Sequence, residues 1–260
     1  MGIININEGI TYDGNTFIVD FKNNTTKDII SIAKPYINKS SILDNVYYFG
    51  YKFTEDVDSR IRTKFIHYLK GIGENVIDSI TLGNLIALPL NELNKKENLS
   101  TFGCLLYSRS NRSNLVYEIH NIICTIVPHL KTNSFELIKQ LPQTVTFDWD
   151  MFDTNYIGEL DDYRYQQIYN YIQNELLPKV HSLDYFSIAE NVKSKYRKYI
   201  TNFLDFADDR SKKAFCDLQH NKVLIVDDIN TTQSTLNEII RIVITVNPEI
   251  EIYIFTLIGK

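Results

Sequence analysis

The C-terminal part of the chain contains two apolar runs separated by an amphipathic segment, and this order constrains the fold most. The first run, KVLIV, begins at Lys222, and the second, EIYIFTLI, begins at Glu251. Between them, the segment STLNEIIRIVITV (residues 234–246) has apolar residues at helical spacing, and Pro248 follows as a stop. Strand, helix and strand in this order predict a right-handed βαβ unit with two parallel strands. We therefore expect an α/β protein with a parallel sheet.

Composition sets limits on the class of protein. The chain has 260 residues, 44% of them hydrophobic, which is enough for one sizeable core, so we expect a single domain over residues 1–260. The net charge of −5 gives no global field that attracts nucleic acid or an anionic membrane. No signal peptide or long apolar run is evident, so no membrane association is expected. Three cysteines without metal or redox spacing indicate structural thiols in a reducing cytosol, so we expect a cytoplasmic protein: Cys104, Cys124 and Cys216.

Residues 1–75 are expected to form an N-terminal hairpin and helices. The segment ITYDGNTFIVD (10–20) alternates around an Asp-Gly pair, which is a strong hairpin signal. KDIISIAKPYI (27–37) and SRIRTKFIHYLKGIG (59–73) have helical spacing, and two glycines close the second segment.

The middle of the chain is expected to supply further core elements. NLIALPL (84–90) and TFGCLLYS (101–108) are predicted as buried strands separated by the polar loop NELNKKENLS, and a helix is predicted over 113–126. Residues 141–153 predict a short strand and an acidic loop. Residues 160–206 predict a Tyr-rich helical insertion of two helices, broken near Pro178, that forms a cap on the core.

The strand KVLIV runs directly into Asp227 and Asp228. Ligands of open α/β sheets bind beyond the carboxyl ends of the strands, and two adjacent carboxylates there need a cation or hydrogen-bond donors. For an isolated acid pair, a helix cap or a structural acceptor is an equal alternative. The next residues, TTQST (231–235), lead into a helix N-terminus, where free N–H groups and hydroxyls bind anions. Together these residues predict a ligand that carries both hydroxyl groups and phosphate.

The segment VLIVDDINTTQST resembles the signature loop of the type I phosphoribosyltransferases. The resemblance implies that Asp227 and Asp228 address the ribose hydroxyls directly or through Mg²⁺, as metal ligands and catalytic residues. It also implies that five residues surround the 5-phosphate of phosphoribosyl pyrophosphate: Thr231, Thr232, Gln233, Ser234 and Thr235.

The upstream stretch DDRSKKAFCDLQHNKVLIVDD is similar to the competence-associated (ComF-like) branch of this family, in the positions of Arg210 and Phe215. The stretch YYFGYKFTEDVDSRIRTKFIHYLKG is similar to that branch in its tyrosine, arginine and lysine-glycine pattern. The resemblance covers residues 208–260, and also the core from 80 to 130. Two residues depart from the family pattern: Asn230 replaces an aliphatic residue, and Gln233 replaces a small one. The side chain of Gln233 can crowd the anion, so both an enzyme and a ligand binder without turnover are compatible with this loop.

A second anion loop is expected in this family, and LLYSRSNRSN (105–114) is the best candidate. Ser110 and Arg112 would contact the pyrophosphate, and Arg109 could do so as well. An equal alternative is a solvated helix start capped by Ser110 or Ser113. The segment ADDRSKKAF (207–215) could be a mobile loop that brings Arg210, Lys212 or Lys213 to the leaving group, or a basic surface loop.

Other candidate sites are weaker. The acidic residues of DWDMFD could hold a metal, although a solvated loop is favoured, and the scattered histidines predict no metal site. Basic and Tyr residues alternate over 193–199 and could contact nucleic acid, although core packing of the tyrosines is favoured.

These observations predict a type I phosphoribosyltransferase-like core with a helical insertion and an N-terminal β-hairpin. Its expected ligand is phosphoribosyl pyrophosphate or a nucleotide, bound with Mg²⁺. Transfer of the phosphoribosyl group is one function compatible with this ligand. The alternative is a catalytically impaired effector or regulatory subunit of a bacterial antiphage complex of the retron type, with protein partners.

Overall fold

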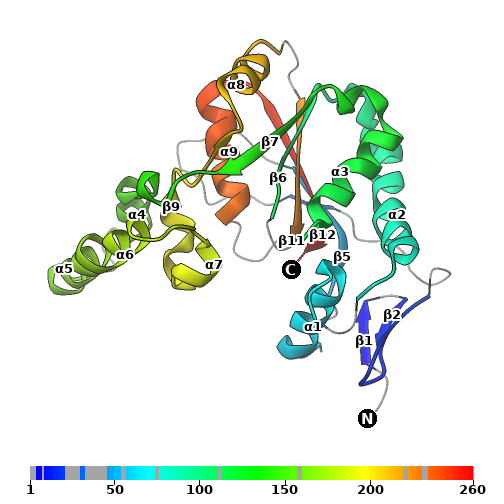
Figure 1. Ribbon diagram of the computed structural model, residues 1–260, viewed down its shortest axis with the longest axis horizontal. Helices are drawn as coiled ribbons and strands as arrows, with labels where there is room; N and C mark the ends of the chain where they lie inside the picture. The colour runs from blue at the N-terminus through cyan, green and yellow to red at the C-terminus, as the bar shows by residue number, and fades with distance from the viewer. Residues whose placement is uncertain are drawn as a thin grey trace.

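A mixed sheet of seven strands, in the order β10-β7-β6-β11-β12-β5-β4, forms the centre of the protein (Figure 1). The computed structural model describes residues 4–7, 9–20, 30–32, 46–53, 57–73, 76–110, 113–156, 160–218, 222–229 and 234–259. The five inner strands are parallel: β7 (Ser134–Lys139), β6 (Cys104–Ser108), β11 (Lys222–Ile229), β12 (Glu251–Gly259) and β5 (Val46–Lys52). The edge strands β10 (Leu204–Phe206) and β4 (Ile30–Ile32) are antiparallel to their neighbours. The expected α/β class with a largely parallel sheet is confirmed.

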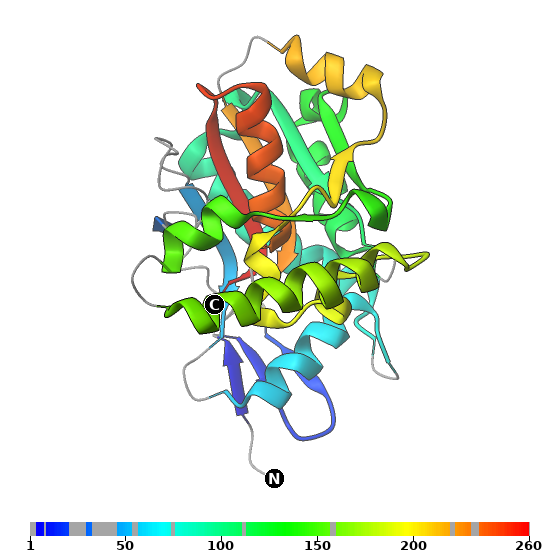
Figure 2. The same cartoon turned by 90° about the vertical axis from the view of Figure 1, so that its left-hand side faces the viewer.

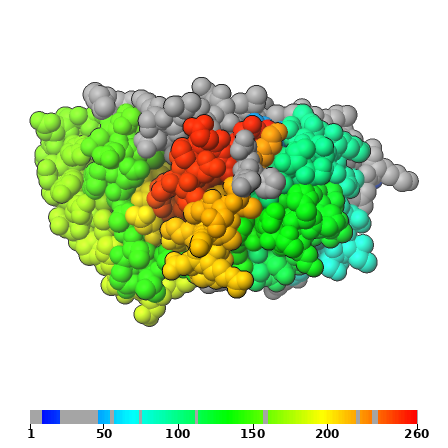
Figure 3. Space-filling model, turned by 90° about the horizontal axis from the view of Figure 1, so that it is seen from above, coloured from blue at the N-terminus to red at the C-terminus, as the bar shows by residue number. Residues whose placement is uncertain are grey.

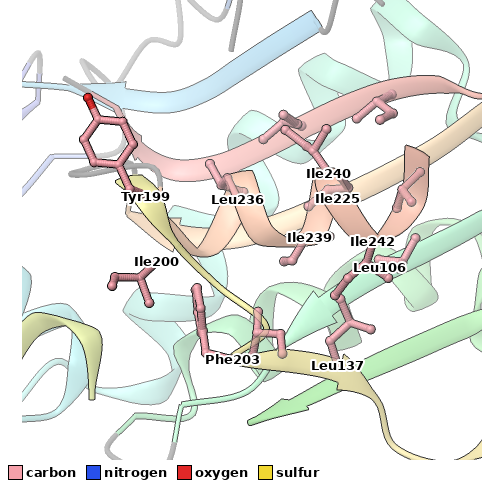
Figure 4. Close-up of a cluster of buried hydrophobic side chains, with 14 of the residues drawn as sticks. Leu106, Leu137, Tyr199, Ile200, Phe203, Ile225, Leu236, Ile239, Ile240 and Ile242 are labelled. Atoms are coloured by element: carbon pink, nitrogen blue, oxygen red, sulfur yellow. The ribbon is translucent and has the colours of Figure 1, made fainter. Parts of the chain in front are cut away.

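Helices cover both faces of this sheet, so the core has three layers (Figure 1). One face carries α9 (Ser234–Val246), and the other carries α2 (Ser79–Glu97) and α3 (Leu115–Ile126). The apolar side chains of α9 pack on Ile225 of β11 and on neighbouring strands (Figure 4). The predicted βαβ unit is confirmed, because β11 and β12 pair in parallel on either side of α9 in the sequence.

The N-terminal elements follow the sequence prediction in part. The expected hairpin is formed by β2 (Ile10–Tyr12) and β3 (Phe17–Val19), and β1 (Ile4–Asn7) adds a third antiparallel strand. The helix α1 (Ser59–Lys70) ends as predicted, at Gly71 in the left-handed conformation with φ of 66°. The helix predicted over 27–37 is wrong in its described part, because residues 30–32 form β4 and pair with β5. The remainder of that prediction lies outside the described residues.

The strand predicted at NLIALPL is wrong, because these residues lie inside α2, and the loop predicted after it is also helical as far as Glu97. The buried residues of α2 recur at helical spacing: Leu85, Ile86, Pro89, Leu90 and Leu93. An apolar run of this length reads equally well as a strand or as a buried helix. The N-cap favours the helix, because the Asp78 side chain accepts hydrogen bonds from the N–H groups of Ile80 and Thr81 in its first turn.

The predicted insertion differs from expectation in its second half. Its first helix comprises α5 (Asp162–Tyr171), a π-helical turn (Ile172–Leu176) and α6 (Leu177–His181), and Pro178 lies in the first turn of α6 without breaking the path. The second predicted helix is replaced by short elements: α7 (Ile188–Asn191), a 3₁₀ helix (Ser194–Tyr199), β9 (Ile200–Thr201) and β10. The acidic loop predicted at DWDMFD is mostly the helix α4 (Trp149–Tyr156), which follows β8 (Thr146–Phe147).

The insertion belongs to the main core. Its buried aromatic residues, including Tyr199 and Phe203, join one hydrophobic cluster with α9 and β11 (Figure 4). The helices α4 to α6 lie to one side of the sheet (Figure 1) and face the viewer in Figure 2. The remaining elements are α8 (Asp209–Cys216) and 3₁₀ turns at Leu99–Thr101, Pro128–Lys131 and Pro142–Thr144. Within the described ranges, none of the helices combines the length and the apolar character that crossing a bilayer requires.

Candidate functional site

The two predicted ligand loops leave neighbouring strands at one edge of the sheet. β6 and β11 pair in parallel, so the carboxyl end of β6 at Ser108 lies beside that of β11 at Ile229. A cavity of about 270 Å³ opens there, lined by residues of α1 on one side and of α7 on the other. Figure 1 shows both helices near the carboxyl end of β11. Its lining includes charged residues of both signs: Lys70, Arg109, Lys139, Asp227 and Asp228. We therefore place the candidate site in this cavity.

Asp227 and Asp228 approach the cavity from opposite faces of β11. Side chains alternate along a strand, and Ile225 belongs to the core cluster under α9, whereas Val226 belongs to the cluster under α2 and α3. The backbone N–H of Asp228 donates to Oδ1 of Asp227 over 2.9 Å, which ties the two residues together. The Asp228 residue is only 7% exposed. Both carboxylates reach the same cavity because they stand at the end of the strand.

Lys70 neutralises Asp228, and this contact was not predicted. Its Nζ lies 2.6 Å from Oδ2 of Asp228, and the two side chains are 22% and 9% exposed. Lys70 is the last residue of α1, and Gly71 turns the chain away immediately afterwards. The lysine-glycine pair was part of the family pattern, but no role followed from the sequence for Lys70 itself.

The pKa of Asp227 is raised above its ordinary value. Burial at the strand end is the largest cause, and repulsion by the Asp228 charge is the second. The N–H of Asp228 and the charge of Lys70 lower the pKa again, but they do not cancel the increase. Keeping the Asp227 carboxylate charged in this place therefore costs free energy. Acids with a raised pKa of this kind are common at ligand-binding sites.

The predicted anion loop after β6 is held from two sides. Nε of Arg109 lies 3.4 Å from Oε1 of Glu136, and its guanidinium lies 4.2 Å from the ring centroid of Tyr117. Ser110 lines the cavity and forms an isolated β-bridge with Ser113. The hydroxyl of Ser113 accepts from the N–H of Leu115 over 3.2 Å at the start of α3, so a helix-start role exists beside the cavity. Arg112 lies outside the described residues.

The loop after β11 is described only at its far end. Thr235 lines the cavity with the two aspartates, and Ser234 begins α9 as a buried residue. The N-terminus of α9 therefore lies near this edge of the sheet. The predicted phosphate-binding residues Thr231, Thr232 and Gln233 lie outside the described part of the chain, as does Asn230.

Arg210, for which a catalytic role was predicted, lies on a helix and not on the expected loop. The segment expected to be a mobile or basic loop is the helix α8, whose N-terminus is capped by Asp208. α8 precedes β11 and lies at the amino end of the strand (Figure 1), where it appears in orange near the centre of Figure 3. The strand rises about 3.3 Å per residue, so Lys222 and Asp227 are roughly 16 Å apart along β11. Arg210 is exposed on α8 and is not among the residues that line the cavity.

The opposite wall of the cavity comes from the insertion. Four consecutive residues around the start of α7 line it: Phe186, Ser187, Ile188 and Ala189. Lys139, at the end of β7, also reaches this wall, and its Nζ lies 4.6 Å from the ring centroid of Tyr185. This wall was not predicted from the sequence, because β7 was not expected and α7 was not separated from a longer helix.

The other candidate sites have structural partners. Asp148 accepts from the N–H of Met151, and Asp153 accepts from the hydroxyl of Tyr165. Across the described ranges, no group of three or more His, Cys, Asp or Glu residues is placed to hold a metal. Two carboxylates at the strand end do fit a Mg²⁺ ion that arrives with ligand oxygens, because Mg²⁺ commonly uses one or two carboxylates together with phosphates and water.

The surface at 193–199 offers lysines but not free rings. Tyr196 and Tyr199 are buried, so they are not open to stacking by bases. Lys195 and Lys198 each lie 4.7 Å from the ring centroid of the tyrosine that follows them. The favoured interpretation of these tyrosines as core residues is confirmed.

Comparison with models of known families and with curated proteins yields no match.

Proposed function

We propose that the protein binds phosphoribosyl pyrophosphate, or a nucleotide with a 5-phosphate, in the cavity at the carboxyl ends of β6 and β11. One observation carries this proposal: the acid pair, Thr235 at the start of α9, and the Arg109–Ser110 loop all line the same cavity. Acceptors for sugar hydroxyls and donors for anions thus stand on adjacent strands. The volume of about 270 Å³ suits a ligand of the size of a sugar phosphate.

Each group has a task in this proposal. Asp227 and Asp228 accept hydrogen bonds from two ribose hydroxyls, and Thr235 with the N-terminus of α9 donates to the 5-phosphate. Arg109, held by Glu136 and Tyr117, faces a second anionic group. Asp227 and Asp228 would also hold Mg²⁺, which supplies positive charge to the pyrophosphate when bound. In an enzyme, these residues would orient the ligand while pyrophosphate leaves C1 of the sugar.

The second candidate function is a phosphoribosyl-ligand binder that regulates a bacterial antiphage complex of the retron type. The position of α8 favours this candidate, because Arg210 is remote from the cavity and the expected cationic lid over the leaving group is absent from the described residues. Gln233, which replaces a small residue of the family pattern, points in the same direction.

Calorimetric titration with phosphoribosyl pyrophosphate, with and without Mg²⁺, tests the proposal. We expect saturable binding that Mg²⁺ strengthens. Asp227→Asn and Asp228→Asn should each weaken it about ten- to a hundred-fold, since a hydrogen bond to a charged group contributes roughly 1.5 to 3 kcal/mol. Asp150→Asn, an exposed site on α4, is the matched control and should bind normally.

The absence of any binding heat at millimolar ligand in the folded protein would refute the proposed site. Pyrophosphate release in the presence of candidate bases then separates the two functions. Release by the wild-type protein identifies a transferase, and binding without release identifies a regulatory binder.

A further inference from the structure

Asp228 has a counter-ion within the chain. The Nζ of Lys70 is 2.6 Å from Oδ2 of Asp228, and both side chains are largely removed from water. A buried carboxylate requires such compensation, because removal of either partner leaves an isolated charge in a poorly solvated place. The ammonium of Lys70 thus supplies the positive charge beside Asp228.

Lys70 also stands between two cavities. It lines the candidate site with Asp228, and it lines a neighbouring cavity of about 520 Å³ between α1, α2 and α3. The anion loop after β6 borders both spaces, since Ser110 lines the first and Ser113 lines the second. Lys70 therefore shares a cavity with Arg109 and Ser110, where the anionic part of the ligand is expected.

We propose that Lys70 is an exchangeable counter-ion: it holds Asp228 while the ligand is absent, and it passes to an anionic group of the ligand when a divalent cation engages Asp228. The two cations exclude each other at Asp228 because like charges at contact distance repel strongly in a poorly solvated site. The ligand's identity in this inference rests on the proposed function, whereas the competition at Asp228 does not.

Titration with Mn²⁺ alone, followed by electron paramagnetic resonance, measures the competition directly. Lys70→Met removes the charge and keeps most of the stem, so we expect Mn²⁺ to bind at least about tenfold more tightly than to the wild type. Lys64→Met is the matched control, because Lys64 lies on the same helix and contacts the hydroxyl of Tyr12 instead. Equal Mn²⁺ affinity in wild type and Lys70→Met would overturn the proposal.

Two further measurements bear on the same exchange. In the double variant Lys70→Met with Asp228→Asn, the gain in Mn²⁺ affinity should disappear, because the gain acts through Asp228. In the wild-type protein, Mn²⁺ should increase the rate at which a methylating reagent modifies Lys70, measured by mass spectrometry, and should leave Lys64 unchanged. This second measurement requires no variant to fold, and an unchanged rate at Lys70 would contradict the exchange.

The ligand side is tested with phosphoribosyl pyrophosphate and Mg²⁺. At a Mg²⁺ concentration that saturates both proteins, the cation already engages Asp228 in each, so only the charged contact to the anion differs. Under this condition Lys70→Met should bind the ligand about ten- to a hundred-fold more weakly than the wild type, and Lys70→Arg should recover part of the affinity. Unchanged ligand affinity in Lys70→Met would overturn the transfer to the anion. If the wild-type protein binds no such ligand, the proposed function fails, and the Mn²⁺ experiment still decides the role of Lys70 at Asp228.

Discussion

At the scale of single residues, Asp227 and Asp228 differ in what compensates their charge. Asp228 is paired with Lys70, whereas Asp227 accepts a hydrogen bond from the N–H of Asp228 and carries a raised pKa. An acid with a raised pKa binds more protons in the folded state than in the unfolded state. Folded stability therefore falls as pH rises from the ordinary value of 3.8 toward the raised pKa, and the loss persists above it.

Asp227→Asn should accordingly raise the free energy of unfolding at neutral pH. We expect a gain on the order of 1 to 2 kcal/mol, because Asn keeps the acceptor oxygen and removes the charge. The gain should shrink toward zero as pH is lowered to about 4, where the wild-type carboxyl is protonated. Denaturant unfolding at several pH values measures this difference.

Asp228→Asn provides the contrast, since it leaves the ammonium of Lys70 without its carboxylate and should destabilise the protein at neutral pH. A stabilising effect of both substitutions, or of neither, would contradict the assignment of distinct environments to the two aspartates.

The sequence predicted that the acid pair lies at the end of a strand, because this position follows from the order of the residues along the chain. It did not predict Lys70 or Glu136 as partners. Each comes from an element distant in the sequence and meets its partner only through the tertiary fold. The loop expected around Arg210 was suggested by the resemblance, whereas the structure has the helix α8 there, capped by Asp208.

At the scale of elements, β5 packs closely against β12 and α2. A Cβ atom at Gly50 would lie 2.8 Å from the carbonyl oxygen of Leu257 and 3.1 Å from Cγ of Pro89. The backbone oxygen cannot move without disturbing the sheet, so Gly50→Ala should lower the free energy of unfolding by roughly 1 to 3 kcal/mol.

Gly83 is the matched comparison within α2. A Cβ atom there meets nothing within 4 Å, and the residue lies in the interior of the helix. Gly83→Ala should therefore raise the free energy of unfolding by about 0.5 to 1 kcal/mol. Thermal or denaturant unfolding of the two variants should give opposite signs, and a common sign would contradict the packing described for β5 and α2.

Helices and strands were predicted correctly where the periodicity of apolar residues agreed with the turn and cap residues at their ends. The hairpin at 10–20, α1 with its closing glycines, and the strand–helix–strand unit at the C-terminal part all combine a clear period with turn or cap residues. α2 was missed because its apolar run is short enough for a strand and contains Pro89. The short elements in the second half of the insertion were predicted as one helix, because their buried aromatic residues were interpreted as the apolar face of a helix.

At the scale of the whole molecule, the insertion and the sheet share one hydrophobic cluster, so they should unfold together. The single tryptophan, Trp149, reports on the insertion, because its ring lies 4.6 Å from that of Phe147 and 5.0 Å from that of Tyr169. Tryptophan fluorescence and far-ultraviolet circular dichroism should give coincident denaturant transitions. A fluorescence transition at clearly lower denaturant would show that the insertion is a separate folding unit.

The pairing of β5 with β12 has a consequence for how the protein is made. Val46 lies beside Tyr253, so the partner of β5 is translated about 200 residues later. Until β12 leaves the ribosome, β5 lacks its parallel neighbour, and the backbone N–H and C=O groups on that side of β5 have no strand to pair with. The central layer can close only after β12 has been translated, and a nascent chain stalled before β12 would expose an unpaired strand edge to chaperones and to other nascent chains.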